Sequence, residues 1–232
     1  MTAVPSRNFL ASVVIPVLND TPQLAGALTS IGHDPRVEIV VVDGGNGEAR
    51  ATLEDVAPHV TWLRSAPGRG RQMNEGAGVS RGQWLLFLHA DTRLPSGWID
   101  EVERAARNPA CVGGSFRLQL DSPSRWARLI ERGVAARVRW CDLPYGDQAL
   151  FVRRDIFMSL GGYEDLPLME DVAFVRRLAR AGRLCHSPLP AVTSARKWEA
   201  DGWLVRSLEN VALVLLFLVG VSPRRLAARY RR

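Results

Sequence analysis

The sequence predicts an α/β fold, with a mostly parallel central sheet that is flanked by helices and followed by C-terminal helices. Two observations lead to this prediction. Four short apolar segments alternate with helical patterns over residues 12–88, which is the order of consecutive strand–helix units. Each segment is apolar at consecutive positions, as strands are when a parallel sheet is covered on both faces.

The predicted strands of this first part cover residues 12–17, 38–43, 60–63 and 85–88. The helices between them are expected from Asp20 or Thr21 onward, over residues 48–56 and over residues 72–79. Pro16 should end the first strand or place it at a sheet edge, because proline has no N–H to donate to a neighbouring strand.

Beyond residue 91 the pattern is less regular. Strands are predicted over residues 112–120 and 149–152. Helices are predicted over residues 98–107, 124–139, 155–161, 170–181, 203–219 and 223–230. On the helix over 124–139, we expect Trp126, Leu129 and Val134 on one side. No repeat or low-complexity linker divides the chain, so residues 1–232 are expected to form one domain.

The composition narrows the class of protein. A hydrophobic content of 47% with 23% charged residues is typical of a soluble globular domain. Cys111, Cys141 and Cys185 are isolated, which argues against a disulfide framework or a zinc site and for a reducing compartment. The N-terminal segment lacks the pattern of a signal peptide. These features predict a cytoplasmic protein.

The C-terminal segment combines an apolar helix with a basic tail. Residues 211–219 are all apolar but are too few to span a membrane, which takes about 20 residues. The last nine positions include five arginines: Arg224, Arg225, Arg229, Arg231 and Arg232. Such a helix is buried, forms a homodimer interface or lies peripherally on the inner face of a membrane. The sequence leaves these alternatives open.

Polar side chains follow three of the predicted strands at the point where each strand ends. Asn19 follows the first strand, Asp43 ends the second, and His89 and Asp91 follow the fourth. In a parallel sheet these carboxyl ends meet at one edge, where ligands bind. The chain lacks GxGxxG after the first strand, which disfavours a dinucleotide site, and it lacks the GxxxxGK[ST] phosphate loop.

The segments SVVIPVLND, VVVDGG, GRGRQMNEGA, LLFLHADTRLP, GDQALFVRR and PLMEDV occur in this order. Together they resemble the motifs of family 2 glycosyltransferases with the GT-A fold, from about residue 12 to residue 198. The nearest resemblance is to a subgroup with HADT where other members have DADD. Some members of that subgroup are associated with arsenosugar biosynthesis.

The resemblance implies an enzyme that transfers a sugar from a UDP- or GDP-linked donor to an acceptor hydroxyl. It implies a nucleotide-binding half over residues 12–120, an acceptor and catalytic half over 121–200, and a helical extension over 201–232. No nucleic-acid ligand is expected, because the positive charge is concentrated in a tail. A nucleotidyltransferase and a non-catalytic nucleotide-sugar-binding protein are the alternatives.

On the donor side, the resemblance implies that Pro16 and Asn19 line the base and ribose. Asp43, next to Gly45 in the second strand-end motif, would accept a hydrogen bond from the base. Arg71 would contact the nucleotide or its diphosphate. These residues come from three separate segments, so the prediction requires that the fold brings them together.

His89 and Asp91 match the metal-binding motif of the family. Asp91 takes the place of its last acid, which ligates Mn²⁺ or Mg²⁺. His89 takes the place of the first acid, where a neutral imidazole could contact ribose but adds no negative charge. Metal binding would then depend on Asp91, diphosphate oxygens and water.

Glu170 and Asp171 open a predicted helix, where acidic residues also stabilise the helix dipole. The family pattern implies that Asp171 is the general base that deprotonates the acceptor, with Glu170 orienting acceptor or donor. A positioned base contributes about 10²–10⁴-fold to the rate. One base opposite the leaving group implies direct displacement with inversion.

Four further residues are expected around the acceptor or the diphosphate: Gln148, Arg196, Lys197 and Trp198. Arg196 or Lys197 would pair with phosphate, and Trp198 would stack on a sugar or acceptor. The alternative is a cationic loop with a core tryptophan.

Overall fold

The computed structural model describes residues 9–55 and 57–230. The first part of the chain forms β1 (Ala11–Val17), α1 (Thr21–Ile31), β2 (Val37–Asp43), α2 (Glu48–Leu53), β3 (Val60–Arg64), α3 (Arg69–Val79) and β4 (Trp84–Phe87). The four strands are parallel and lie in the order β3-β2-β1-β4. This confirms the predicted parallel strand–helix units; the predicted end of the second helix, residue 56, lies outside the described residues.

β1 lies inside the sheet, between β2 and β4, and continues through Pro16 to Val17. The prediction that Pro16 ends the strand or lies at an edge is therefore wrong. β4 ends at Phe87, opposite Val14, and the Leu88 N–H donates to the Val14 carbonyl at 3.0 Å. The backbone of Pro16 points toward β4, as that of Val14 does, because residues two apart in a strand have the same orientation. Pro16, however, lies beyond the end of β4. Its missing N–H therefore interrupts no bond between the strands.

The second half of the chain extends this sheet and builds another. β6 (Cys111–Gly114), β8 (Leu150–Arg153) and β9 (Arg183–Leu184) continue the large sheet in the order β4-β8-β6-β9, with β8 antiparallel to β4 and β6. β5 (Thr92–Arg93), β7 (Arg117–Asp121) and β10 (Pro190–Ser194) form a three-stranded sheet. The sheet is thus mostly parallel, as predicted, with an antiparallel strand in its second half.

The strand predicted over residues 112–120 is wrong, because β6 and β7 belong to different sheets. The chain turns at Ser115 and Phe116. There, the Phe116 N–H donates to the Gln148 carbonyl at 2.9 Å, and Ser115 Oγ lies 2.9 Å from His186 Nδ1. Apolar and polar residues keep alternating through the turn, so a pattern of period two does not reveal it.

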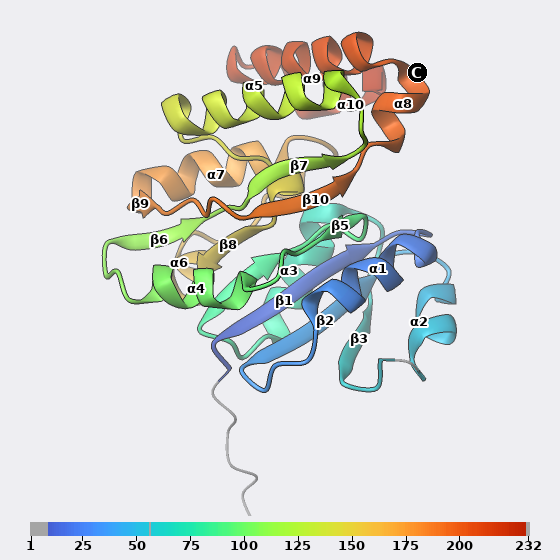
Figure 1. Cartoon of the computed structure of the whole chain (residues 1–232), viewed down its shortest axis with the longest axis vertical. Helices are drawn as coiled ribbons and strands as arrows, with labels where there is room; N and C mark the ends of the chain where they lie inside the picture. Colours follow the sequence, from blue (N-terminus) through green and yellow to red (C-terminus); the bar gives the residue numbers. More distant parts are fainter. Residues whose placement is uncertain (1–8, 56, 231–232) are drawn as a thin grey trace, which may run out of the picture.

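Helices cover both faces of the large sheet (Figure 1). On one face, α1 and α4 (Trp98–Ala106) pack on Val13, Ile15 and Leu86. On the other face, α3, α6 (Arg154–Ser159) and α7 (Glu170–Ala181) pack on Val14 and Leu85. Consecutive strand residues therefore belong to two different cores, which explains why these strands are apolar at every position.

Four helices form a further layer beyond the small sheet (Figure 1): α5 (Arg125–Cys141), α8 (Arg196–Asp201), α9 (Trp203–Leu218) and α10 (Pro223–Tyr230). α5 packs on β7 through Ala127, Ile130 and Val134. Trp126 and Leu129 are exposed, so the prediction that they share a side with Val134 is wrong. The small side chain of Ala127 lets the helix approach the strand, which turns the two larger residues outward.

α9 has one buried face and one exposed face. Leu213 and Val214 are buried, whereas most of the large apolar residues on the opposite side are exposed. Complete burial of this helix, one of the predicted alternatives, is therefore wrong. Within residues 9–55 and 57–230, no helix has the length and apolar content that crossing a bilayer requires.

Candidate active site

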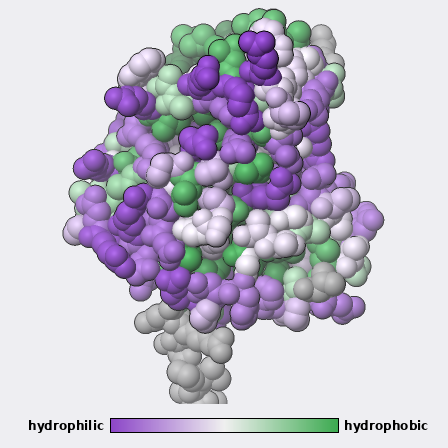
Figure 2. Space-filling view, in the orientation of Figure 1, coloured by the Kyte–Doolittle hydropathy of each residue, from purple (hydrophilic) through white to green (hydrophobic). Residues whose placement is uncertain are grey.

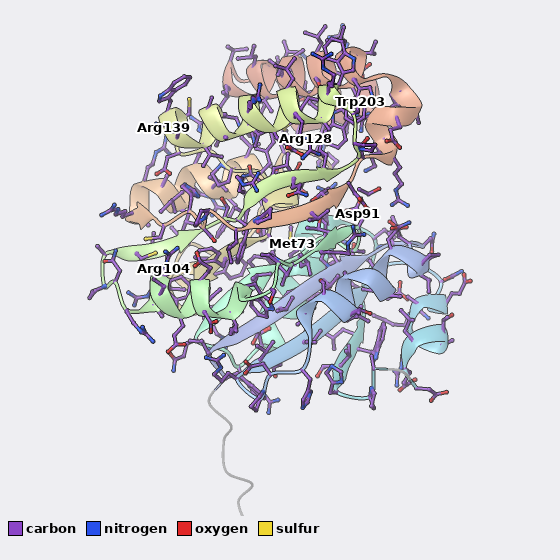
Figure 3. All side chains as sticks on the ribbon, viewed as in Figure 1. Met73, Asp91, Arg104, Arg128, Arg139 and Trp203 are labelled. Carbon is purple, nitrogen blue, oxygen red and sulfur yellow. The ribbon has the colours of Figure 1, made fainter. Side chains whose placement is uncertain are left out.

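Two adjoining cavities open where β1 and β4 end. The β1 cavity includes Pro16 and Leu18 in its lining, and the α9 cavity includes Asn210 and Leu213. Five residues line both cavities: Arg69, His89, Asp91, Glu170 and Lys197. Figure 3 shows Asp91 between the large sheet and the layer of C-terminal helices. The fold therefore brings α3, the end of β4, the start of α7 and α8 to one place.

The predicted base-binding residues lie together at the ends of β1 and β2. Asp43 is 3% exposed, and its Oδ1 accepts a hydrogen bond of 2.7 Å from the Gly45 N–H, while its Oδ2 is buried without a hydrogen-bond partner. Asn19 has a left-handed backbone and packs on Gly45, where a Cβ would collide with the Asn19 side chain. Pro16 lines the neighbouring β1 cavity. Asp43 Oδ2 is therefore an unused hydrogen-bond acceptor, although Asp43 itself lines neither cavity.

Gln72, which the sequence analysis did not select, joins the two strand ends. It is buried, and its amide nitrogen donates to the carbonyls of Val17, at 2.9 Å, and Val42, at 2.8 Å. These bonds hold β1 and β2 together beside the β1 cavity, which Gln72 also lines.

The cations that line the cavities come from α3 and α8, and also from α9 and α10, which contribute Arg206 and Arg224. Arg69 lines both cavities, and its Nη1 lies 3.3 Å from Glu170 Oε1. Arg71, the predicted diphosphate contact, lines neither cavity and pairs instead with Asp165 at 2.6 Å. The predicted pair on α8 does reach the site: Arg196 lines the β1 cavity and Lys197 lines both. Arg69 is therefore a site residue that the sequence analysis missed.

Arg196 connects the first strand end with the predicted metal ligand. It donates to Asp20 through both Nη atoms, and its Nη2 lies 3.8 Å from Asp91 Oδ2. Asp20, rather than the adjacent Asn19, lines the β1 cavity. A guanidinium held in this way is positioned next to any anion that approaches Asp91.

The environment of His89 favours the neutral form of its imidazole. Burial, together with the positive charges of Arg69 and Lys197, holds its pKa well below the usual value for histidine. A neutral imidazole can donate or accept one hydrogen bond, but it does not attract a metal ion by charge. The surroundings of His89 are thus consistent with the prediction that it adds no negative charge to the site.

Asp91 fits a metal ion that arrives with its substrate. In the part of the chain that the structure describes, no group of three or more His, Cys, Asp or Glu side chains could hold a metal ion. Mg²⁺ is commonly bound by only one or two carboxylates, with substrate phosphates and water completing its shell. The Asp91 carboxylate lines both cavities and has Arg196 as its nearest charged partner. One carboxylate of this kind suits an ion that is shared with a diphosphate.

Glu170 and Asp171 occupy the first turn of α7 but have different surroundings. Asp171 lines the α9 cavity, and its two carboxylate oxygens accept hydrogen bonds of 2.8 Å from the backbone N–H groups of Val172 and Gly146. Glu170 is 3% exposed. Burial raises the pKa of Glu170, and the Asp171 charge adds to this, while Arg69 opposes it. Asp171 is thus a carboxylate that two backbone N–H groups orient.

The short 3₁₀ helix η1 (Gly146–Gln148) places another acid, Asp147, in the site. Gln148, the predicted residue, lines neither cavity; it is buried and bonds to Phe116, Tyr145 and Arg137. Asp147 lines the α9 cavity instead, and its Oδ1 is buried without a hydrogen-bond partner. Burial raises its pKa to about 6; the Asp171 and Asp91 charges also raise it, and Arg137 lowers it.

The α9 cavity also has aromatic and apolar residues in its lining. Trp198 lines it with a buried, unpartnered Nε1. The apolar part of the lining comes from α7, the segment before it, and α9: Leu168, Met169, Val172, Leu213 and Val214. An acid-lined cavity with an apolar wall can hold a hydroxyl group that is attached to a larger apolar body.

The chain matches the profile of glycosyl transferase family 2 over residues 12–163. A PGL/p-HBAD biosynthesis glycosyltransferase from Mycobacterium bovis (strain BCG / Pasteur 1173P2) is 28% identical over 169 residues, which cover 66% of this chain and 62% of the relative. An uncharacterized protein, MT1568, from Mycobacterium tuberculosis is 28% identical over 210 residues, 77% of this chain and 65% of that protein. The chain therefore spans somewhat less than two thirds of these relatives.

Solved structures with the same fold include a mannosyltransferase and a protein in complex with UDP. Mannosyltransferase PcManGT from Pyrobaculum calidifontis, in complex with GDP-Man and Mn²⁺, superposes with a TM-score of 0.68 at 17% identity, over 95% of this chain and 67% of that one. S. aureus TarS in complex with UDP gives a TM-score of 0.63 at 13% identity, over 79% and 60%. These likenesses show the GT-A fold, and the profile match over more than half of the sequence shows the family: the chain belongs to glycosyl transferase family 2.

Proposed function

We propose that this protein transfers a sugar from a nucleotide-diphosphate sugar to an acceptor hydroxyl, with inversion at the anomeric carbon and with a divalent cation. The observation that carries the proposal is that Asp91 and Asp171 line the same cavity, from the end of β4 and the start of α7. One carboxylate is available for the diphosphate side and the other for the acceptor side. Residues 12–200 and the helical extension act together as one catalytic unit.

The donor occupies the β1 cavity and the neighbouring strand ends in this proposal. Asp43 Oδ2 accepts a hydrogen bond from an N–H group of the base, and uracil and guanine both have such a group. Pro16, Asn19 and Gly45 lie around the base. Structural neighbours of this chain hold GDP-Man, UDP and UDP-GlcNAc. Both bases therefore belong in any test of the donor.

The diphosphate lies against Arg69, Arg196 and Lys197, which supply positive charge next to Asp91. Asp91 would hold the divalent cation, Mn²⁺ or Mg²⁺, with the diphosphate. When bound, that ion supplies stabilisation of the negative charge that develops on the leaving group. The neutral His89 leaves Asp91 as the charged protein ligand.

The acceptor occupies the α9 cavity, which Trp198, the apolar residues and Asp171 all line. Asp171 takes the proton of the acceptor hydroxyl, and the hydroxyl oxygen forms a bond to the anomeric carbon. The bond from that carbon to the diphosphate breaks, and its electron pair leaves with the nucleoside diphosphate. A single displacement of this kind inverts the anomeric configuration.

A thermal-shift panel with UDP, GDP, dTDP and CDP, each with and without Mn²⁺, tests the proposal. We expect UDP or GDP to raise the melting temperature in a Mn²⁺-dependent way, and we expect Asp91→Asn to lose the Mn²⁺-dependent part. Asp155→Asn is a matched control, because Asp155 is an exposed acid that pairs with Arg153 and lines neither cavity. No shift with any of the four nucleotides would overturn the proposed donor class.

A further inference from the structure

The exposed apolar side chains of this protein are concentrated on its C-terminal layer. Thirteen large hydrophobic residues are exposed among those described, and only Leu18, Val79 and Met158 lie elsewhere. Three are on α5, namely Trp126, Leu129 and Trp140. The other seven are Leu204, Val205, Leu208, Val211, Leu215 and Leu218 on α9, and Val219 directly after it. Figure 2 shows this apolar area at the end of the molecule that α9 forms.

The exposed residues of α9 form one face of the helix. Leu204, Leu208, Val211, Leu215 and Leu218 follow one another at steps of three or four residues, which places them in one stripe. We call this stripe, with Val205 and Val219, the α9 face. The opposite side of the same helix is used for packing and for the α9 cavity, through Leu213 and Val214. A continuous exposed stripe of this kind marks a surface that binds an apolar partner.

The exposed charges of α5, α9 and α10 are mostly positive, and the adjoining α8 adds the exposed acids Glu199 and Asp201. Six arginines are exposed on α5 and α10: Arg125, Arg132, Arg139, Arg224, Arg225 and Arg229. Among the described residues of α5, α9 and α10, Glu209 is the one exposed acid. Arginine beside exposed leucine, valine and tryptophan is the composition of a helix that lies at the surface of an anionic bilayer.

We propose that the α9 face, with the exposed arginines of α5 and α10, docks this protein onto an anionic lipid bilayer. α9 has 16 residues, about 24 Å at 1.5 Å per residue, and it lies along the bilayer surface without crossing it. Its apolar stripe enters the boundary between headgroups and acyl chains, and the arginines contact anionic headgroups. The α9 cavity then lies within about one helix diameter, ~10 Å, of the bilayer.

A second copy of this chain fits the same face less well. In a two-fold dimer, the same surface is used by both copies, so the arginines of one copy would face those of the other. The exposed acids of this layer, Glu209 together with Glu199 and Asp201 of α8, are fewer than the six arginines. An anionic bilayer supplies both the apolar layer and the negative charge that this surface lacks.

Co-sedimentation of the full chain with vesicles tests the proposal, and it needs no nucleotide or acceptor. Vesicles of phosphatidylcholine alone are compared with vesicles that also contain phosphatidylglycerol. We expect binding to the anionic vesicles that weakens with salt and is roughly tenfold or more weaker for the double variant Leu208→Glu/Leu215→Glu. Val79→Glu/Met158→Glu is the matched control, because it adds two acids at exposed apolar sites elsewhere, and we expect it to bind like the wild type.

A second variant, Arg225→Glu/Arg229→Glu, tests the charge without changing the α9 face, and we expect a similar loss on anionic vesicles. Circular dichroism checks that each variant is folded. Failure of the wild type to bind anionic vesicles, or full binding by both surface variants, would overturn the proposal. So would a dimer in sedimentation velocity that Leu208→Glu/Leu215→Glu dissociates while vesicle binding is absent. A failed nucleotide panel with intact vesicle binding would instead count against the proposed sugar transfer alone.

Discussion

The Oδ2 atom of Asp171 accepts a hydrogen bond of 2.8 Å from the backbone N–H of Gly146. This bond joins the first turn of α7 to η1, although the two segments are far apart in the sequence. A Cβ built on Gly146 would lie 2.7 Å from His89 Nε2 and 3.4 Å from Asp171 Oδ2. Because residue 146 has no side chain, the histidine and the carboxylate can share one wall of the α9 cavity.

Gly146→Ala should lower the rate of sugar transfer by about tenfold or more, because small displacements of reacting groups are costly. The new methyl group pushes His89 away from its position and disturbs the turn that orients Asp171. Gly133→Ala is the matched control, since nothing lies within 4 Å of a Cβ at this helical position. We expect it to keep full activity and to raise the free energy of unfolding by about 0.5–1 kcal/mol. Equal activity of the two variants would contradict the importance of this contact.

Asp171→Asn should reduce the transfer rate by about 10²-fold or more, because the amide cannot accept the acceptor proton. Asparagine also has one oxygen where two N–H groups need acceptors, so about 1–3 kcal/mol of stability should be lost. Activity must therefore be compared at equal folded fraction, measured by denaturant titration. The exposed Asp155→Asn serves as control, and a variant at position 171 that retains wild-type turnover would exclude this residue as the base.

Asp147 should make the stability of the protein depend on pH. Its pKa is raised to about 6, above the ordinary value of 3.8, so the folded state holds the proton more tightly than the unfolded chain. Stability contributed by this group therefore falls as pH rises from about 4 to about 6, and remains lower above that.

Asp147→Asn removes this penalty and should raise the free energy of unfolding at pH 7 by about 1–3 kcal/mol, with little gain near pH 4. Urea unfolding at the two pH values measures the difference. An equal gain in the free energy of unfolding at both pH values would show that the charge of the Asp147 carboxylate does not cause the loss of stability.

Substitutions of Arg69 and Arg71 test which of these two arginines contacts the diphosphate. Arg69 lines both cavities, whereas Arg71 pairs with the exposed Asp165. Arg69→Gln should raise the KM for the donor by about tenfold, which corresponds to one charged hydrogen bond, and Arg71→Gln should change it by less than about twofold. The reverse order in donor kinetics would restore Arg71 to the role that the motif alone assigns to it.

Much of the site could be predicted from local sequence. Asp43, His89 and Asp91 follow short apolar runs, and such runs predict buried parallel strands whose carboxyl ends meet. The position of these residues at one edge depends only on strand direction. Glu170 and Asp171 could also be placed, because a motif before a helical pattern locates them in the first turn of a helix.

Side-chain direction in irregular segments could not be predicted in this way. Arg69 and Arg71 are two residues apart on α3, about 200° around a helix, so only the docking of that helix decides which one faces the cavities. Gln148 and Asp147 are neighbours in η1, and Ala149 follows with a left-handed φ of 46°. That turn places the glutamine inside the protein and the aspartate in the cavity.

The parallel strand–helix order and the residue types at the strand ends can be predicted from the chain alone, because both depend on local patterns of hydrophobicity and on short motifs. The central position of Pro16, the division of residues 112–120 between two sheets and the exposed face of α9 become clear only in the folded protein. These features depend on contacts between segments far apart in the chain. The sequence pattern of a segment indicates whether it prefers a helix or a strand, but it does not identify the surface against which that segment packs.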